Sequence, residues 1–189
     1  MVGLFYFSRM KPIMETERLI LREWILEDAE NFFELNNNPD VIRYTGDPPF
    51  DSVKATREFI RNYDAFNKEG MGRWVCILKE TGENIGWCGL RKKPEGFVDL
   101  GYRFHRRHWN IGFATEAGQI CLAYGFSHLN LEIIVAHAMI ENKASSRVMK
   151  KLGMRYIGQE ISEGHPSVRY EITQEEFLKE LPTFSLPKP

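Results

Sequence analysis

Hydrophobic and polar positions change their period several times along the chain. Residues 14–24 alternate between two faces, which is typical of a strand. Residues 25–33 instead carry apolar side chains at helical spacing, until the turn-rich residues 36–39 stop the pattern. A second helix is expected from Asp51, a good N-cap, and Gly70 lies beyond its end. One strand and two helices therefore precede the middle of the chain.

The middle of the chain predicts three strands in succession. Residues 74–78 and 85–90 are rich in β-branched and aromatic residues, and a short polar turn at 80–83 separates them. This pattern favours an antiparallel hairpin. A further turn at 93–96 leads to a third strand over 97–104. Together the three strands form an antiparallel meander.

A helix and a buried strand follow this meander. Apolar residues recur every three or four positions over 112–127, which predicts a helix. Residues 131–139 have the composition of a fully buried strand. A strand, a crossover helix and another buried strand indicate a parallel pair joined by a right-handed crossover.

The last third of the chain predicts two helices and two strands. Asn142 caps a helix that Gly153 closes. Strands are expected at about 154–161 and 167–172, and a short terminal helix over 174–181.

These elements predict an α/β (α+β) fold in a single domain over residues 14–181. The sheet is expected to be mixed and mostly antiparallel, seven-stranded, with the parallel pair at its centre and helices on its flanks. A chain of 189 residues has the usual size of one domain. Residues 1–13 form an N-terminal extension in this scheme, and residues 182–189 form a C-terminal tail.

Composition narrows the class of partner. The chain is 43% hydrophobic and 27% charged, with a net charge of -1, which is ordinary for a globular protein. A nucleic-acid binder would show a strong basic excess, whereas only Arg103, Arg106 and Arg107 cluster here. Phosphates on a small molecule explain that cluster equally well. We therefore expect no nucleic-acid partner.

The cysteines and the hydropathy indicate a cytoplasmic protein. Cys76, Cys88 and Cys121 are odd in number and share no metal-ligand spacing, so they are expected to be buried free thiols of a reducing compartment. The first residues lack the pattern of a signal peptide, and no stretch is long enough to span a bilayer. No metal site and no membrane contact are expected.

Residues 107–117 have the physical character of an anion site. They pass from the end of a strand through a tight loop into a helix. The first turn of a helix offers unpaired N–H groups and a partial positive charge. Gly112 and Ala114 let a phosphate approach that backbone, and Arg106 and Arg107 can add charge-assisted bonds. A plain helix start with solvated arginines is the structural alternative.

Several motifs together resemble the GNAT N-acetyltransferase superfamily, with the nearest match in its RimJ/RimL branch. They are Gly-Tyr-Arg-Phe at 101–104, Trp-Asn-Ile-Gly-Phe-Ala-Thr-Glu-Ala at 109–117, Asn-Lys-Ala-Ser at 142–145, Leu-Gly-Met at 152–154, Glu-Asn-Ile-Gly at 83–86 and Glu-Thr-Glu-Arg-Leu-Ile-Leu-Arg at 15–22. Each motif is weak alone, but together they are specific and cover residues 14–172.

The resemblance implies acetyl-CoA as co-substrate and assigns residues to it. Backbone groups of Tyr102, Arg103 and Phe104 would pair with the pantetheine arm and face the thioester carbonyl. Asn142 and Ser145 would contact the pantetheine near the sulfur. The pyrophosphate would be held by the loop and its neighbours, which are Arg107, Trp109, Asn110, Ile111, Gly112, Phe113, Ala114 and Thr115.

The catalytic residues are less well determined. Many relatives carry a tyrosine acid where this chain has Met149, which rules out tyrosine catalysis from that position. Ser145 is the substitute, with a capping role as the alternative. Asp99 is the expected base, directly or through water, with a solvated strand carboxylate as the alternative. His137 is the other candidate base, or a satisfied core histidine. Trp87 is expected to reach the acceptor cleft.

Three functions remain compatible with the sequence. The first is acetyl transfer to a primary amine by direct attack, with a peptide or protein N-terminus as acceptor. The second keeps the chemistry but takes an amino acid, polyamine or aminoglycoside. The third is a non-catalytic module that binds CoA. A dinucleotide-binding fold is excluded because no Gly-x-Gly-x-x-Gly follows an early strand. Monomer and homodimer both remain open.

Overall fold

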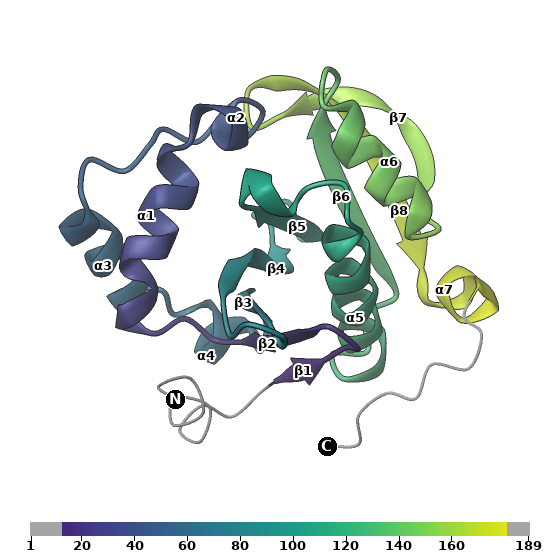
Figure 1. Ribbon diagram of the computed structural model, residues 1–189. Helices are drawn as coiled ribbons and strands as arrows, with labels where there is room; N and C mark the ends of the chain where they lie inside the picture. Colours follow the sequence, from purple (N-terminus) through teal and green to yellow (C-terminus); the bar gives the residue numbers. More distant parts are fainter. Residues whose placement is uncertain (1–12, 181–189) are drawn as a thin grey trace.

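One open sheet of eight strands runs through residues 13–180, the part of the chain that this computed structural model describes. Its order is β1-β2-β3-β4-β5-β6-β8-β7 (Figure 1). The strands are β1 (Met14–Glu15), β2 (Leu19–Arg22), β3 (Arg73–Leu78), β4 (Asn84–Lys92), β5 (Val98–Phe104), β6 (Ile133–Met139), β7 (Arg155–Ser162) and β8 (His165–Thr173). Neighbouring strands pair antiparallel except β5 and β6, which run parallel. The predicted mixed sheet with a central parallel pair is confirmed.

The strand expected over 14–24 is in fact two strands, so the sheet has eight strands and not seven. β1 and β2 form a hairpin in which Met14 pairs with Leu21. The turn between them is closed by Thr16, whose N–H donates to the Leu19 carbonyl at 2.9 Å and whose hydroxyl accepts from the Leu19 N–H at 2.9 Å. Ile13, predicted within the extension, donates its N–H to the Leu21 carbonyl at 3.0 Å and packs against the core. Residues 1–12 and the predicted tail 182–189 lie outside the described residues.

Four short helices precede β3 in the chain (Figure 1). They are α1 (Ala29–Asn37), α2 (Pro39–Ile42), α3 (Val53–Arg61) and α4 (Ala65–Glu69), and α1 follows the 3-10 turn η2 (Leu26–Asp28) and packs against β4. The single helix expected from Asp51 is therefore two helices. Its cap is Ser52, whose hydroxyl accepts from the Ala55 N–H at 3.1 Å, and Gly70 ends α4 with a φ of 65°. Asn38 and Pro39 also start α2, which the sequence interpretation treated only as a stop.

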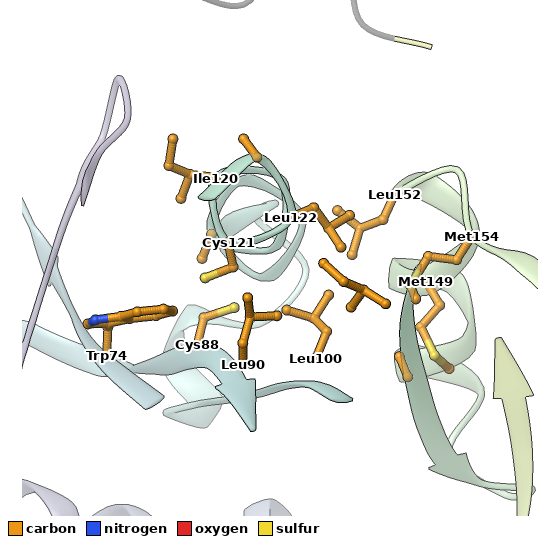
Figure 2. Packing of buried hydrophobic residues seen from close by; sticks show 14 of the residues in the cluster. Trp74, Cys88, Leu90, Leu100, Ile120, Cys121, Leu122, Met149, Leu152 and Met154 are labelled. Carbon is orange, nitrogen blue, oxygen red and sulfur yellow. The ribbon is translucent and has the colours of Figure 1, made fainter. Parts of the chain in front are cut away.

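The main core lies between the sheet and α5 (Phe113–Ser127). Figure 2 shows Cys121 and Leu122 of this helix facing Cys88, Leu90 and Leu100 of β4 and β5. The helix is apolar over most of its circumference because α6 (Lys143–Lys151) packs against its other side. The two helices approach closely at Gly118, where an added Cβ would lie 2.8 Å from Leu152. α7 (Gln174–Glu180) follows β8.

The two parallel strands at the centre of the sheet, β5 and β6, pair over a very short length. β5 and β6 pair only where Asp99 lies opposite Val135, so the rest of β5 has no strand partner on that side within the described residues. Backbone groups beyond Asp99 are consequently available to a ligand. This separation positions the site described below.

Two further properties of the described residues bear on the sequence predictions. Cys76, Cys88 and Cys121 are buried and free, as predicted. Between residues 13 and 180, no helix combines the length and hydropathy needed to cross a membrane.

Candidate active site

Two cavities meet at the point where β5 and β6 separate. The first, here called the loop cavity, has a volume of about 400 Å³ and lies between α6 and the loop that leads into α5. The second, here called the sheet cavity, has a volume of about 150 Å³ and lies over β3, β4 and β5 beside the β7–β8 turn. The residues that line both cavities are Tyr44, Thr45, Tyr102, Arg103, Asn142 and Ser145.

The loop before α5 has the backbone geometry of an anion site. Asn110 and Gly112 both adopt left-handed conformations, with φ of 62° and 92°. Left-handed residues alternating with right-handed ones turn successive N–H groups toward one concave point, which suits a phosphate. Asparagine tolerates this conformation better than other residues with a Cβ. No side chain caps the first turn of α5, which lines the loop cavity, so the N–H groups of Phe113 and Ala114 have no side-chain acceptor, whereas the Thr115 N–H donates to the Gly112 carbonyl at 3.1 Å.

A pair of charged residues fixes this loop to the start of the sheet. The Glu116 carboxylate, in the first turn of α5, accepts from the Arg18 backbone N–H at 2.9 Å, from Arg18 Nε at 2.6 Å and from the Thr16 hydroxyl. Arg18 Nη1 also donates to the Ile111 carbonyl at 3.1 Å. Burial raises the pKa of Glu116, but the bonds from Thr16 and Arg18 outweigh burial and lower it. Sequence reasoning missed this function of Arg18.

Cationic side chains surround the loop cavity. Arg43, Arg147 and Lys151 line it, and none of them pairs with a carboxylate in the part of the chain that the structure describes. Arg106 also lines it and pairs with Asp40 at 2.6 Å. Arg107, which was expected to contribute, points to Glu83 instead and does not line the cavity. The loop cavity therefore suits a ligand with several phosphates.

Two hydroxyl groups meet at the junction of the cavities. The Tyr102 hydroxyl lies 2.8 Å from the Ser145 hydroxyl and donates to the Ser145 carbonyl at 3.1 Å. Asn142 caps α6 by accepting from the Ser145 N–H at 3.1 Å, which fixes Ser145 in place. Burial raises the pKa of Tyr102 well above its usual value, so the phenol stays protonated. Sequence reasoning used only the backbone of Tyr102 and missed its hydroxyl.

Asp99 and His137, proposed from the sequence as rival bases, are bonded to each other in the sheet cavity. Asp99 Oδ1 lies 2.9 Å from His137 Nδ1, and Glu160 Oε1 lies 2.9 Å from His137 Nε2. Burial lowers the pKa of His137, but the bonds and charges of Asp99 and Glu160 outweigh burial and raise it. The two carboxylates therefore favour the charged imidazole, which can donate a hydrogen bond from each ring nitrogen.

Trp87 forms the floor of the sheet cavity. It is 3% exposed, and its ring lies 4.2 Å from the Arg73 guanidinium and 5.4 Å from that of Arg103. Arg103 turns its side chain to Asp47, at 2.6 Å, and to Asn36. Only the backbone of Arg103 is thus left for the contact expected from the sequence.

The model of one protein family matches most of the chain. This model is described as an acetyltransferase (GNAT) domain, and it matches residues 18–155. The chain belongs to the GNAT acetyltransferase family. The uncharacterized N-acetyltransferase p20 of Bacillus licheniformis is 38% identical over 146 residues, which are 76% of this chain and 82% of the relative. The solved GNAT-family acetyltransferase from Bacillus anthracis superposes with a TM-score of 0.74 at 29% identity, over 86% of this chain and 98% of the other.

More distant solved structures share the fold alone. The spermidine N-acetyltransferase from Vibrio cholerae, in complex with CoA and spermine, superposes with a TM-score of 0.74 at 22% identity, covering 86% of this chain and 99% of that one. Mycobacterium smegmatis RimJ, in complex with CoA-disulfide, superposes with a TM-score of 0.74 at 22% identity, over 87% of this chain and 84% of that one.

In this acetyltransferase, the residues singled out from the sequence divide between the two cavities. Those that line the loop cavity are Tyr102, Arg103, Phe104, Trp109, Asn110, Gly112, Phe113, Ala114, Thr115, Asn142 and Ser145. Arg107 and Ile111 do not line it. Trp87, Asp99 and His137 line the sheet cavity. Residues 13–180 contain no cluster of three or more histidine, cysteine or acidic side chains that could hold a metal ion.

His105 is buried at the end of β5 in this acetyltransferase. It is only 5% exposed, and its Nε2 lies 3.2 Å from the Asn31 side-chain oxygen. Burial, together with Arg107, lowers the pKa of His105 to about 4. The side chain therefore joins the end of β5 to α1 as a neutral group. The sequence pattern did not show that α1 covers this end of the strand.

Proposed function

We propose that acetyl-CoA binds in the loop cavity and that the chain transfers its acetyl group to a primary amine in the sheet cavity. The observation that carries this proposal is the meeting of the two cavities at Tyr102 and Ser145, beside the unpaired edge of β5. A phosphate-bearing ligand in the first cavity and an amine in the second would present their reacting ends to each other there. The acceptor that best fits the family branch suggested by the motifs is a peptide or protein N-terminus.

The loop cavity fits the cofactor's phosphates and its pantetheine arm. The N–H groups at 110–114 would hold the pyrophosphate, since that of Thr115 already donates to the Gly112 carbonyl, and Arg147 and Lys151 supply cations that lack an ion-pair partner in the described residues. The free backbone groups of β5 beyond Asp99 would pair with the pantetheine amides. Acetyl-CoA supplies an activated acyl group. The protein must then remove the protons of the acceptor amine and stabilise the negative charge on the departing sulfur.

Asp99, His137 and Glu160 provide a route for the acceptor's proton. An amine attacks only without its extra proton, and its nitrogen must lose a second proton as the bond to the acyl carbon forms and the carbon–sulfur bond breaks. Asp99 and His137 line the sheet cavity, and the Glu160 side chain is 40% exposed. The bonded chain from Asp99 to Glu160 therefore connects the reacting nitrogen with solvent.

Tyr102 and Ser145 are placed to assist the leaving sulfur. Both hydroxyls lie at the junction of the cavities and are bonded to each other. Because burial raises the pKa of Tyr102, the phenol stays protonated and can donate a hydrogen bond that stabilises the departing thiolate. Met149, at the position where many relatives carry a tyrosine, is fully buried in the core.

A small-molecule amine is the second candidate acceptor. The spermidine N-acetyltransferase named above is the observation in its favour, and RimJ is the matching observation for the peptide N-terminus. The buried free thiols suit the reducing cytoplasm in either case.

The proposal is tested by measuring free thiol released from acetyl-CoA over a panel of amines. The panel contains peptides with different first residues, amino acids, polyamines and aminoglycosides. Amine-dependent thiol release is expected, together with a rise in melting temperature on adding acetyl-CoA. A protein that gains stability with acetyl-CoA and releases no thiol with any amine is a non-catalytic CoA-binding module, and that result would remove the proposal.

A further inference from the structure

Arg73 is the one cation of the sheet cavity that has no ionic partner in the described part of the chain. Four cationic side chains line this cavity, together with three carboxylates and His137. Arg91 and Lys93 pair with Glu163 at 2.5 Å each, and Arg103 pairs with Asp47. The Arg73 side chain makes neither an ion pair nor a hydrogen bond with any residue from 13 to 180.

The sheet is built so that the Arg73 side chain reaches into the cavity. Arg73 of β3 lies opposite Gly89 of β4, and Gly89 lies opposite Gly101 of β5. These two glycines leave the surface of the sheet free of side chains along that row. The Arg73 guanidinium therefore extends across β4, and its Nη2 lies 3.8 Å from the point where a Cβ on Gly101 would be. Its face stacks on the Trp87 ring.

The charge of Arg73 is costly in this position without a ligand. Burial, and then the nearby charges of Arg91 and Arg103, lower the pKa of the Arg73 guanidinium. A stacked guanidinium leaves its N–H edges free, and those edges match a carboxylate in a two-bond arrangement. All three carboxylates of the cavity are already bonded to other groups. None of the described carboxylates that line the cavity is therefore left as an ionic partner for Arg73.

We infer that the acceptor of this acetyltransferase carries a carboxylate close to its amine and that Arg73 binds this carboxylate. The inference rests on the proposed function and specifies its substrate class. Gly101 is two residues from Asp99 on the same face of β5, roughly 7 Å along the strand. An amine at Asp99 and a carboxylate at Arg73 thus belong to one small group, such as an amino acid or an acidic N-terminal residue. Polyamines are poor acceptors because they would meet Arg73 with a like charge.

Matched acceptor pairs test this inference with acetyl-CoA and the full chain. Alanine against alaninamide isolates an α-carboxylate. Asp-Ala-Ala amide against Asn-Ala-Ala amide isolates a side-chain carboxylate, and spermidine supplies the polycation. The wild type should use the acidic member of at least one pair with a kcat/KM higher by tenfold or more. Which pair responds identifies the source of the carboxylate.

Arg73→Gln should abolish this preference through a higher KM for the acidic acceptor, with the KM for acetyl-CoA unchanged. The ratio between two acceptors measured on one preparation does not depend on how much of the variant is folded. Arg91→Gln is the matched control, because it removes a charge of the same sign from the same cavity. Its partner Glu163 remains paired with Lys93 in this variant. Arg91→Gln should therefore retain the preference.

Three results would overturn the inference. The first is amine-dependent thiol release without any preference for the acidic acceptors. The second is transfer to spermidine at least as efficient as transfer to the acidic acceptors. The third is an equal loss of preference in Arg73→Gln and Arg91→Gln. In all three the proposed function survives, because amines are acetylated. If none of the amines caused thiol release, both proposals would be removed together.

Discussion

Tyr102 and Ser145 are the residues whose substitution should affect catalysis more than cofactor binding. Tyr102→Phe keeps the ring that packs against the core and removes only the hydroxyl. Because loss of this hydrogen-bond donor slows the step in which the thiolate leaves, kcat should fall by about 10²-fold. The measurement is steady-state thiol release at saturating substrates, with acetyl-CoA affinity followed by thermal shift.

Ser145→Ala provides the comparison for Tyr102→Phe. It leaves the bond from the Tyr102 hydroxyl to the Ser145 carbonyl intact. A smaller decrease in kcat than in Tyr102→Phe is therefore expected. A Tyr102→Phe enzyme with the kcat of the wild type would show that the hydroxyl does not stabilise the departing thiolate.

His137 determines the expected pH dependence. The pair of Asp99 and His137 can accept a proton from the amine only after it has released its own. Since Asp99 and Glu160 raise the pKa of His137, kcat/KM should increase with pH through an apparent pKa above the usual 6.5 for histidine. His137→Gln should remove this acid limb and lower kcat/KM. Profiles of the two enzymes that superimpose with one amine would contradict the assignment.

The stability of the same variant gives a second check. The folded-state pKa of His137 is raised above the unfolded value, so its contribution to stability is complete below pH 6.5. That contribution disappears as the pH rises through the folded-state pKa. His137→Gln should therefore destabilise the protein more at pH 6 than at pH 9 in urea unfolding.

Single residues were predictable from the sequence where a motif marked them. Residues whose role depends on a contact with a distant part of the chain were not predictable. Asp99 and His137 were both identified, but not their bond, because they are 38 positions apart. Arg73 has no motif, and its exposure to the cavity depends on Gly89 and Gly101 from two other strands. A linear pattern carries no information on such rows across a sheet.

At the scale of elements, the proposed phosphate-binding loop before α5 depends on the β1–β2 hairpin near the start of the chain. Arg18→Met removes the bonds from its side chain to Glu116 and to the Ile111 carbonyl. The loop would then have to be ordered by the ligand, so affinity for acetyl-CoA should fall by about tenfold. Titration calorimetry measures this change.

Lys179→Met is the control for Arg18→Met. It breaks an ion pair of the same 2.6 Å length, with Glu175 on the exposed face of α7. Such a pair contributes little, and α7 does not line the loop cavity. Acetyl-CoA affinity should stay at the wild-type level. Equal losses in the two variants would refute the role given to Arg18.

The elements themselves were largely predictable, with failures at the first strand, at α2 and at the second predicted helix. The helix over 112–127 and the meander follow from local patterns that the tertiary structure keeps. The break of the first strand does not, because Thr16 and Arg18 turn there to reach Glu116, about a hundred residues away. The second helix divides after Arg61 although its apolar spacing continues to Tyr63, whose hydroxyl accepts from the Arg73 N–H.

At the scale of the whole molecule, the proposed function follows from the short parallel pairing of β5 with β6, which the described strands make only where Asp99 lies opposite Val135. A strand pair that separates after Asp99 leaves one edge of β5 open and places the loop cavity and the sheet cavity on either side of Tyr102. The parallel pair was predictable from the strand–helix–strand pattern. The separation and the cavities were not, because they depend on how α6 and the β7–β8 turn close over the sheet.

Steady-state kinetics with both substrates varied tests the two-cavity arrangement most directly. The double variant Arg147→Ala/Lys151→Ala alters exposed residues of the loop cavity, and Arg73→Gln alters the sheet cavity. The double variant should raise the KM for acetyl-CoA by about tenfold and leave the KM for the amine unchanged, and Arg73→Gln should do the reverse. If the double variant raised the KM for the amine, or Arg73→Gln that for acetyl-CoA, the assignment of one substrate to each cavity would be wrong.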